Sequence, residues 1–367
     1  MGARLFRQLL CAALILVLLG ACGDADPPAK PAPPTLAEQL IFYDWAEDMP
    51  QSVLDAFTAE YGVRVNYQTY ETTEEALQNL RAGKVYDVLV IDNPYVPELA
   101  QEGLLAEIDH RNIPNFKHIS ANFRELVFDP GNRFSVTYNW GLTGLIMRAD
   151  RVSPPVTRWA DLWDPRFAGR LLVWELQRGL IGIALKSLGY SINSEDPAEL
   201  EAALERMLAL KAVARTSGYA PEVADQALAG DAVALMYGWA GDVLRARARN
   251  LDIRYVLPAE GGIQWGDNFV IPAASPRKHT AEVFINFLLR PEISAQIVNE
   301  QHYATANETA YPLINPEILN DPVIFPPIGE IRRAEVYMPL SAEGQALYQR
   351  IWERYLAGET GAGSTGR

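Results

Sequence analysis

The sequence predicts an α/β protein of two lobes, each a mainly parallel sheet flanked by helices. Three observations lead to this prediction. The chain has 367 residues, enough for two domains, and 49% of them are hydrophobic, enough for large cores. From residue 40 onward, apolar runs of strand length alternate with segments of helical periodicity. Trp and Asp residues follow several predicted strands, at the end where open parallel sheets bind ligands.

The first half of the chain shows the alternation of strand and helix clearly. Strands are predicted over 40–43, 63–67 and 86–91, and helices over 50–61, 73–82 and 97–102. Pro50 opens the first helix, Gly62 ends it, and Gly83 ends the second. The third strand is apolar except for Asp87, which is typical of a buried parallel strand.

The second half repeats this alternation without repeating the sequence. Strands are predicted over 136–147, 171–174, 233–237, 253–257 and 269–271, and helices over 157–163, 180–188, 281–289 and 345–355. A further helix begins at Asp196-Pro197, where a carboxylate at the N-cap precedes proline at the first helical position.

The first twenty-two residues have the pattern of an export signal. Two arginines precede an apolar run over 9–19, which is too short to span a bilayer as a permanent helix. The small residues before Cys22 resemble the bacterial lipoprotein signal, whose cysteine is acylated and becomes the new N-terminus. We therefore expect removal of residues 1–21 and lipidation of Cys22; the alternative is an ordinary cleaved signal in which Cys22 is incidental.

The segments at both ends of the folded part have biased compositions. Residues 22–38 are predicted to form a semi-rigid tether, because five prolines fall in the eight positions 27–34. A tether between lipid and a folded protein fits work beside a membrane. Residues 358–367 are rich in Gly, Ser and Thr and are predicted to be disordered.

Composition and motifs exclude several classes of function. Acidic residues outnumber basic ones, 46 to 32, which argues against a nucleic acid partner. Two cysteines rule out a disulfide framework and a cysteine-rich zinc site. The histidines show no metal-ligand spacing, and the sequence has no nucleophile elbow and no Walker loop. We expect no catalytic residue, no metal and no cofactor, although paired carboxylates of a hydrolase remain an open alternative.

Three Trp–carboxylate pairs carry the positive signal for function. Each places a Trp two or three residues before an acid beside a predicted strand: Trp45 and Asp48, Trp239 and Asp242, and Trp265 and Asp267. Indole rings attract an organic cation by about 0.5–2 kcal/mol per contact, and carboxylates accept its charge-assisted hydrogen bonds. For one pair, a core Trp beside a capping acid is the better interpretation; three pairs together favour a cation site.

These residues are part of a wider resemblance. The chain resembles the periplasmic spermidine/putrescine-binding proteins of ABC importers over about residues 40–356. The matching stretches, in order, include Phe42-Tyr43-Asp44-Trp45, Gly238-Trp239-Ala240-Gly241-Asp242 and Tyr303-Ala304-Thr305-Ala306-Asn307, together with 86–90, 157–163, 260–265 and 286–291. The resemblance implies a type II periplasmic binding protein, in which two lobes joined by a two-strand hinge close on a polyamine and deliver it to a permease.

The resemblance also implies which residues contact the ligand. The positions that match family contacts are four aromatic residues, two carboxylates and, with less certainty, a serine: Trp45, Trp239, Trp265, Tyr303, Asp242, Asp267 and Ser217.

Other positions depart from the family pattern. Asp48 stands where the family has a tyrosine, and Asp92 where it has a serine. The acids of the second lobe fall near 176–179, where Glu175 is the nearest acid and Arg178 stands instead. We expect Asp48, Asp92 and Glu175 to line the site; whether the two aspartates replace the missing acids or cap turns is open. Arg178 would suit a ligand with a carboxylate.

The expected mechanism is reversible capture without chemistry. The predicted lobes are 39–144 with 267–309 and 145–266 with 310–357, and the hinge strands lie near 141–144 and 265–269. The expected partners are a polyamine or similar small cation and an ABC permease in the inner membrane. We expect a monomer in the periplasm, anchored to a membrane through Cys22. Two alternatives stay open: another small cationic or amino-acid-like ligand, and a ligand-sensing subunit of a membrane receptor.

Overall fold

The computed structural model describes residues 35–46, 48–249 and 251–359. The predicted signal, Cys22 and most of the predicted tether and tail lie outside the described residues. The described strands form one mixed sheet, in the order β2-β1-β3-β9-β4-β7-β5-β6. Their bounds are β1 Gln39–Trp45, β2 Arg64–Tyr70, β3 Val88–Asp92, β4 Ser135–Arg148, β5 Leu171–Trp174, β6 Arg215–Ser217, β7 Leu235–Gly238, β8 Ile253–Val256, β9 Ile263–Val270, β10 Ala304–Thr305 and β11 Glu335–Val336.

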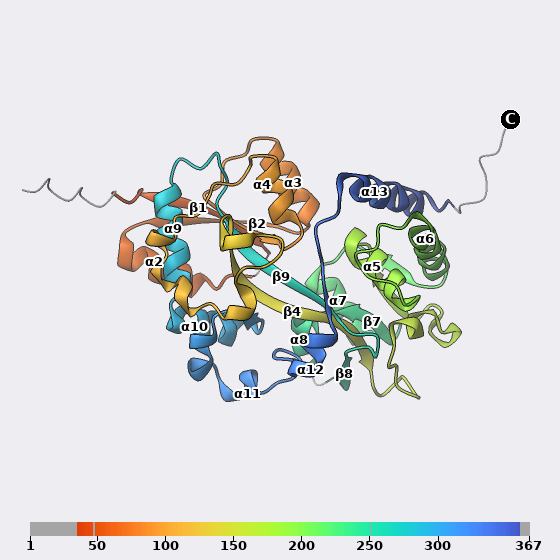
Figure 1. Cartoon of the computed structure of the whole chain (residues 1–367). Coiled ribbons are helices and arrows are strands. Elements are labelled where there is room, and N and C mark those ends of the chain that lie inside the picture. Colours follow the sequence, from red (N-terminus) through yellow and green to blue (C-terminus); the bar gives the residue numbers. More distant parts are fainter. Residues whose placement is uncertain (1–34, 47, 250, 360–367) are drawn as a thin grey trace, which may run out of the picture. The chain divides into compact units, whose positions relative to one another are not determined.

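The sheet is parallel towards its two ends and antiparallel in the middle. β1 pairs in parallel with β2 and β3, and β5 pairs in parallel with β6 and β7. Between these groups, β4 pairs antiparallel with β9, and the two strands lie side by side between two groups of helices (Figure 1). Both strands run unbroken through the positions where the lobe limits are predicted, and those limits stay a prediction.

The helices lie in two groups around this sheet. Their bounds are α2 Gln51–Tyr61, α3 Thr73–Arg81, α4 Tyr95–Gln101, α5 Gln177–Ser187, α6 Pro197–Lys211, α7 Pro221–Ala229, α8 Ala240–Ala248, α9 Lys278–Leu288, α10 Pro291–Gln301, α11 Pro316–Leu319, α12 Ile328–Arg333 and α13 Ala342–Ala357. Figure 1 shows α2, α9 and α10 on one side of the β4–β9 pair, and α5, α6 and α13 on the other. No helix of the described ranges has both the length and the apolar composition needed to cross a bilayer.

The strand β4 contributes to two hydrophobic cores, and all its residues are buried. Val136 and Tyr138 pack in a core formed mainly by β1, β3, α2 and α9. Leu145 and Met147 pack in a second and larger core with β5, β7, α5 and α6. Each core thus holds one group of parallel strands against its helices.

Local sequence signals explain several element ends. α2 ends at Gly62, which adopts the left-handed conformation (φ 70°) that favours glycine. The Asp196 carboxylate accepts hydrogen bonds from the backbone N–H groups of Ala198 and Glu199, as expected for the N-cap of α6. The predicted helix over 157–163 is instead a short 3-10 helix, Trp159–Trp163.

Candidate functional site

A cavity of about 700 Å³ is lined by residues from both groups of elements. Seven of the ten predicted site residues lie on its wall: Trp45, Asp48, Asp92, Trp239, Trp265, Asp267 and Tyr303. The β4–β9 pair crosses it, since Asn139 and Thr143 of β4 also line it. The three predicted Trp residues therefore meet at one cavity, although they come from β1, the start of α8 and β9.

Each of the three tryptophans packs against a tyrosine. The ring centroids are 4.5 Å apart for Trp45 and Tyr70, 4.7 Å for Trp239 and Tyr219, and 5.5 Å for Trp265 and Tyr303. The last two pairs are edge-to-face, with interplanar angles of 83° and 85°, a favoured geometry that fixes the orientation of the indole. The aromatic wall is therefore held in place by neighbours within the protein.

Two glycines make room for this wall. A Cβ atom on Gly141 would lie 2.5 Å from Cζ2 of Trp265, so only glycine lets the indole lie against β4. A Cβ atom on Gly241 would lie 2.5 Å from the hydroxyl oxygen of Tyr303. Trp265 is half-buried, and its indole N–H has no hydrogen-bond partner within the described residues. This nitrogen is itself buried, and it lies against Gly141 of β4.

Asp92 and Asp267 face each other across neighbouring strands. The register of β3 and β9 pairs these two residues directly. Thr73 donates a hydrogen bond to Asp92 (3.1 Å), and the indole N–H of Trp45 donates one to Asp267 (3.3 Å). Burial raises the pKa of Asp267 well above its usual value, and the nearby Asp92 carboxyl raises it further. The pKa of Asp92 is also raised by burial.

Asp48 extends this acidic wall, and Asp44 lies behind it, outside the described lining of the cavity. Burial raises the pKa of Asp48 to about 7, although Asn139 donates a hydrogen bond of 3.2 Å to its carboxylate. Asp44 was not predicted as a site residue. It is fully buried, its Oδ2 has no partner among the described residues, and burial together with Asp48 raises its pKa well above the usual value. Its place at the end of a buried strand, directly before Trp45, was the signal in the sequence.

Asp242 is not among the described residues that line the cavity. It is fully buried and caps its own helix, because its carboxylate accepts the backbone N–H of Trp239 (3.1 Å). It also accepts hydrogen bonds from Tyr219 (3.1 Å) and Arg245 (2.6 Å). Burial raises its pKa, and the Arg245 charge opposes that rise. In this position Asp242 orients Trp239 and Tyr219 from behind.

Glu175 and Ser217 also lie outside the described cavity wall. Glu175 directly follows β5, and Ser217 is the last residue of its partner strand β6. The backbone N–H of Glu175 donates to the carbonyl of Ser217 (2.8 Å). The Glu175 carboxylate accepts a hydrogen bond from Tyr355 (3.4 Å). The structure therefore places this acid next to α13 and not at the cavity.

The sequence analysis missed several polar residues of the cavity wall. They include four glutamates, four tyrosines and one arginine, from both groups of elements: Glu71, Glu74, Glu222, Glu300, Tyr95, Tyr219, Tyr237, Tyr337 and Arg245. Tyrosines are common core residues, so no local signal marked these. Arg178, noted in the sequence for its position, does line the cavity.

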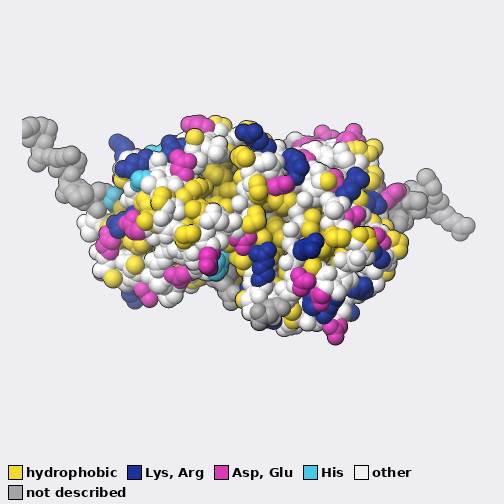
Figure 2. All heavy atoms as spheres, turned by 90° about the horizontal axis from the view of Figure 1, so that it is seen from below, with side chains coloured by type: hydrophobic (Ala, Val, Ile, Leu, Met, Phe, Trp, Pro, Cys, Tyr) yellow, Lys and Arg dark blue, Asp and Glu magenta, His cyan; other side chains and the backbone are white. Residues whose placement is uncertain are grey.

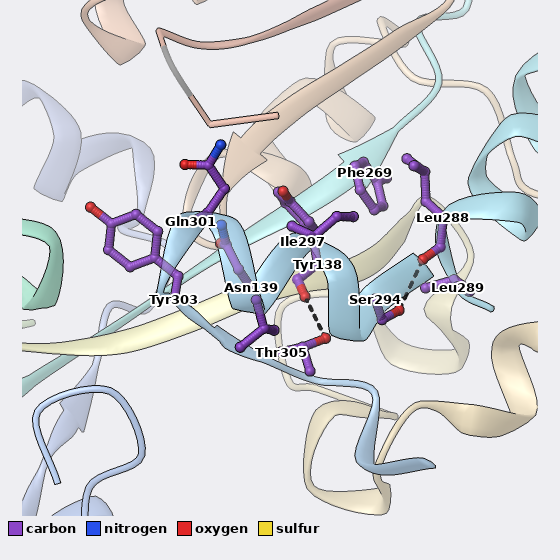
Figure 3. Close-up of a pocket in the computed structure, with 11 residues that line it drawn as sticks. Tyr138, Asn139, Phe269, Leu288, Leu289, Ser294, Ile297, Gln301, Tyr303 and Thr305 are labelled. Carbon is purple, nitrogen blue, oxygen red and sulfur yellow. Dashed lines mark hydrogen bonds between the residues drawn. The ribbon is translucent and has the colours of Figure 1, made fainter. Parts of the chain in front are cut away.

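A small cavity of about 10 Å³ adjoins this region (Figure 3). Asn139 and Tyr303 line both cavities. The small one has room for one water molecule, and the buried Oδ1 of Asn139 has no partner within the described residues. Ser294, also on its wall, donates to the carbonyl of Leu288 (2.9 Å). This packing supports Asn139, which holds Asp48.

The surface seen in Figure 2 carries acidic and basic side chains interspersed, with hydrophobic side chains gathered near the middle of that face. It shows no continuous basic band of the kind that follows a nucleic acid backbone. Among the described residues, no group of three or more His, Cys, Asp or Glu side chains is arranged to hold a metal ion.

Comparisons with known proteins point to one family. The profile of the bacterial extracellular solute-binding proteins matches residues 52–326. The spermidine/putrescine-binding periplasmic protein of Escherichia coli is 36% identical over 323 residues, 87% of this chain and 92% of that protein. A putrescine-binding periplasmic protein of Pseudomonas aeruginosa is 28% identical and covers 87% and 92%. The solved substrate-binding protein of a spermidine/putrescine ABC transporter from Streptococcus pneumoniae superposes with a TM-score of 0.76 at 28% identity, over 88% and 99% of the two chains.

Proposed function

Because the chain belongs to the bacterial extracellular solute-binding proteins, and among them to the spermidine/putrescine-binding periplasmic proteins, we propose that it captures a polyamine in the cavity and delivers it to an ABC importer. Its fold is the two-lobed, type II fold of periplasmic binding proteins, which confirms the fold class predicted from the sequence. Its relatives are periplasmic, and we propose that this chain works in the periplasm as a monomer. The proposed role needs no chemical step.

One observation carries the proposal of a polyamine. Three indole rings and the carboxyl groups of Asp48, Asp92 and Asp267 line the same cavity. A primary ammonium donates up to three hydrogen bonds, which suits a wall of carboxylates, and its methylene chain suits the flanking aromatic rings.

The raised pKa values of the acidic wall support the same proposal. Burial makes ionisation of neighbouring carboxyls costly in the empty protein. An ammonium bound among them removes this cost, because each carboxylate gains an opposite charge at close range. The protein therefore holds an unfavourable arrangement of like charges that a cation relieves.

Calorimetric titration with putrescine and with spermidine tests the proposal. We expect one ligand per chain and measurable heat with at least one of the two. Asp267→Asn is expected to lose tenfold or more in affinity, since it removes the carboxylate that Trp45 contacts. The matched control is Asp231→Asn, at a fully exposed side chain. A folded protein that gives no heat with either amine would refute the proposed ligand.

The membrane anchor is a separate part of the proposal. The sequence before Cys22 supports lipidation there, and the Pro-rich segment that follows gives reach from the membrane. Export of the full chain in a bacterial host, with labelled palmitate, tests this. We expect label in the wild type and its loss in Cys22→Ala, which is then recovered in the soluble fraction. Equal label in both variants would contradict the anchor.

A further inference from the structure

Arg178 is a cavity-lining cation that makes no ion pair within the described residues. The other cavity-lining arginine, Arg245, differs in this respect. Its guanidinium pairs with Asp242 at 2.6 Å and with Asp225 at 3.1 Å, so its charge is balanced inside the protein. The positive charge of Arg178 has no counter-ion among the described residues and can therefore be balanced by a bound molecule.

The Arg178 guanidinium is held rigidly in place. Its Nη2 donates to the side-chain oxygen of Asn193 (3.0 Å) and to the carbonyl of Met338 (3.2 Å). Its Cζ lies 5.1 Å from the ring centroid of Tyr337 and 5.0 Å from that of Tyr348. Its Nε is buried and has no partner among the described residues, and no hydrogen bond there involves Nη1. Neutral groups thus fix the orientation of the charged guanidinium and leave Nη1 without a hydrogen-bond partner among the described residues.

The acidic wall lies within electrostatic reach of this arginine. Burial raises the pKa of Tyr95 and of Tyr337, and for both phenols Asp92 raises the pKa further while Arg178 lowers it. Both phenols also line the cavity. Asp92 and Arg178 therefore act with opposite sign on the same two phenols, and the cavity wall carries both a negative and a positive group.

We propose that the cavity also takes amines whose far end is a carboxylate, with the ammonium at Asp48, Asp92 and Asp267 and the carboxylate on Arg178. The ammonium end of this inference rests on the proposed function, and the carboxylate end goes beyond it. A carboxylate accepts a charge-assisted hydrogen bond from Nη1 of Arg178. The second ammonium of a diamine would instead meet a like charge there. Arg178 is then a specificity-determining residue.

A pair of ligands of equal length tests this. Putrescine carries an ammonium at each end of a four-carbon chain, and in 4-aminobutanoate a carboxylate takes the place of one terminal aminomethyl group. Calorimetry with the wild-type protein is expected to show at least tenfold tighter binding of 4-aminobutanoate. Arg178→Ala is expected to lose tenfold or more for 4-aminobutanoate and to bind putrescine equally well or better. Arg178→Lys, which keeps the charge, should retain part of the preference.

The control variant is Arg158→Ala, whose side chain is largely exposed and is not among those lining the cavity. Circular dichroism verifies that each variant is folded, and the preference of the wild type decides the question even if Arg178→Ala does not fold. Binding of putrescine with no binding of 4-aminobutanoate, or an unchanged preference in folded Arg178→Ala, overturns this inference and leaves the proposed function intact. Failure of both ligands and of spermidine to bind the folded wild type overturns the two together.

Discussion

The buried carboxyl groups beside Trp45 decide the chemistry of the cavity at the scale of single residues. Asp44, Asp48 and Asp267 are each at most 7% exposed, and Asp92 stands opposite Asp267. Four acids in this space repel one another when ionised, so the empty protein keeps part of them protonated. Ligand affinity should therefore depend on pH near neutrality, where isolated carboxyl groups are fully ionised.

The first prediction concerns that pH dependence. With the pKa of Asp48 at about 7, its carboxyl is mostly ionised at pH 8 and mostly protonated at pH 6. The ammonium groups of the ligand stay charged throughout, so affinity should fall about tenfold from pH 8 to pH 6. Titration calorimetry measures this, and binding should release protons. Asp48→Asn should flatten the curve and Glu175→Gln should not; a wild-type affinity constant from pH 6 to 8 would contradict the prediction.

The second prediction concerns the aromatic wall. Trp45→Leu keeps an apolar, though smaller, side chain and removes the ring and its hydrogen bond to Asp267. Loss of one cation–π contact predicts a fall in polyamine affinity of about 5- to 30-fold, or about 1–2 kcal/mol. The matched control is Trp163→Leu, at a ring that packs on Arg206 and is not part of the described wall. Equal losses in the two variants would show that the ring has no specific role.

Two Trp–Asp pairs with identical spacing in the sequence place their aspartates differently in the structure. Trp45 and Asp48 have the same separation as Trp239 and Asp242. Trp239 is the N-cap of α8, so Asp242 stands in the first turn and folds back onto its own helix. Asp48 precedes the start of α2 and lines the cavity instead. The sequence shows the spacing of these residues, but tertiary packing sets where each helix starts, and the helix start decides whether the acid caps a helix or lines the cavity. That either acid contacts the ligand stays a prediction.

The elements were predicted best where their signal is local. β5 has the predicted bounds, and α2 and β1 lie within two residues of theirs. β9 begins at Ile263, six residues before its predicted start, because its first part, which holds the predicted site residues Trp265 and Asp267, is kept as a strand by pairing with β4. The helices α7, α8, α10, α11 and α12 have no counterpart among the predicted elements. The parts that position the site are thus those that depend most on long-range pairing.

The third prediction concerns α8 and its cap. Asp242→Ala removes the cap and leaves Arg245 with only Asp225 as a partner. Loss of this buried carboxylate and of the hydrogen bonds it accepts from Trp239, Tyr219 and Arg245 should lower the free energy of unfolding by about 3 kcal/mol. Urea denaturation measures it, with Asp196→Ala as a control that should cost about 1 kcal/mol, since it removes only the cap of α6. An unchanged midpoint for Asp242→Ala would exclude the structural role assigned to it.

At the scale of the whole molecule, the acidic wall links stability to pH. The folded-state pKa values of Asp48 and Asp267 lie above those of the unfolded chain. The folded protein therefore binds more protons above about pH 4, and this contribution to stability falls as pH rises towards 8. A bound cation removes the cost. The carboxylates that suit a bound cation therefore lower the stability of the ligand-free fold, a trade-off that is common for functional sites.

The fourth prediction follows from this linkage. The Tm of the ligand-free protein should fall from pH 5 to pH 8, and Asp267→Asn should reduce that fall. The rise in Tm caused by putrescine should be larger at pH 8 than at pH 5. Thermal denaturation of both proteins, with and without ligand, measures these differences. If the wild type and Asp267→Asn have parallel pH profiles, the acidic wall does not strain the empty protein.

The strand β4 has a consequence for how the protein melts. Its N-terminal half supplies Val136 and Tyr138 to one core, and its C-terminal half supplies Leu145 and Met147 to the other. Neither core can lose β4 without exposing part of the second one to water. The two halves should therefore unfold in a single cooperative transition, with equal calorimetric and van't Hoff enthalpies.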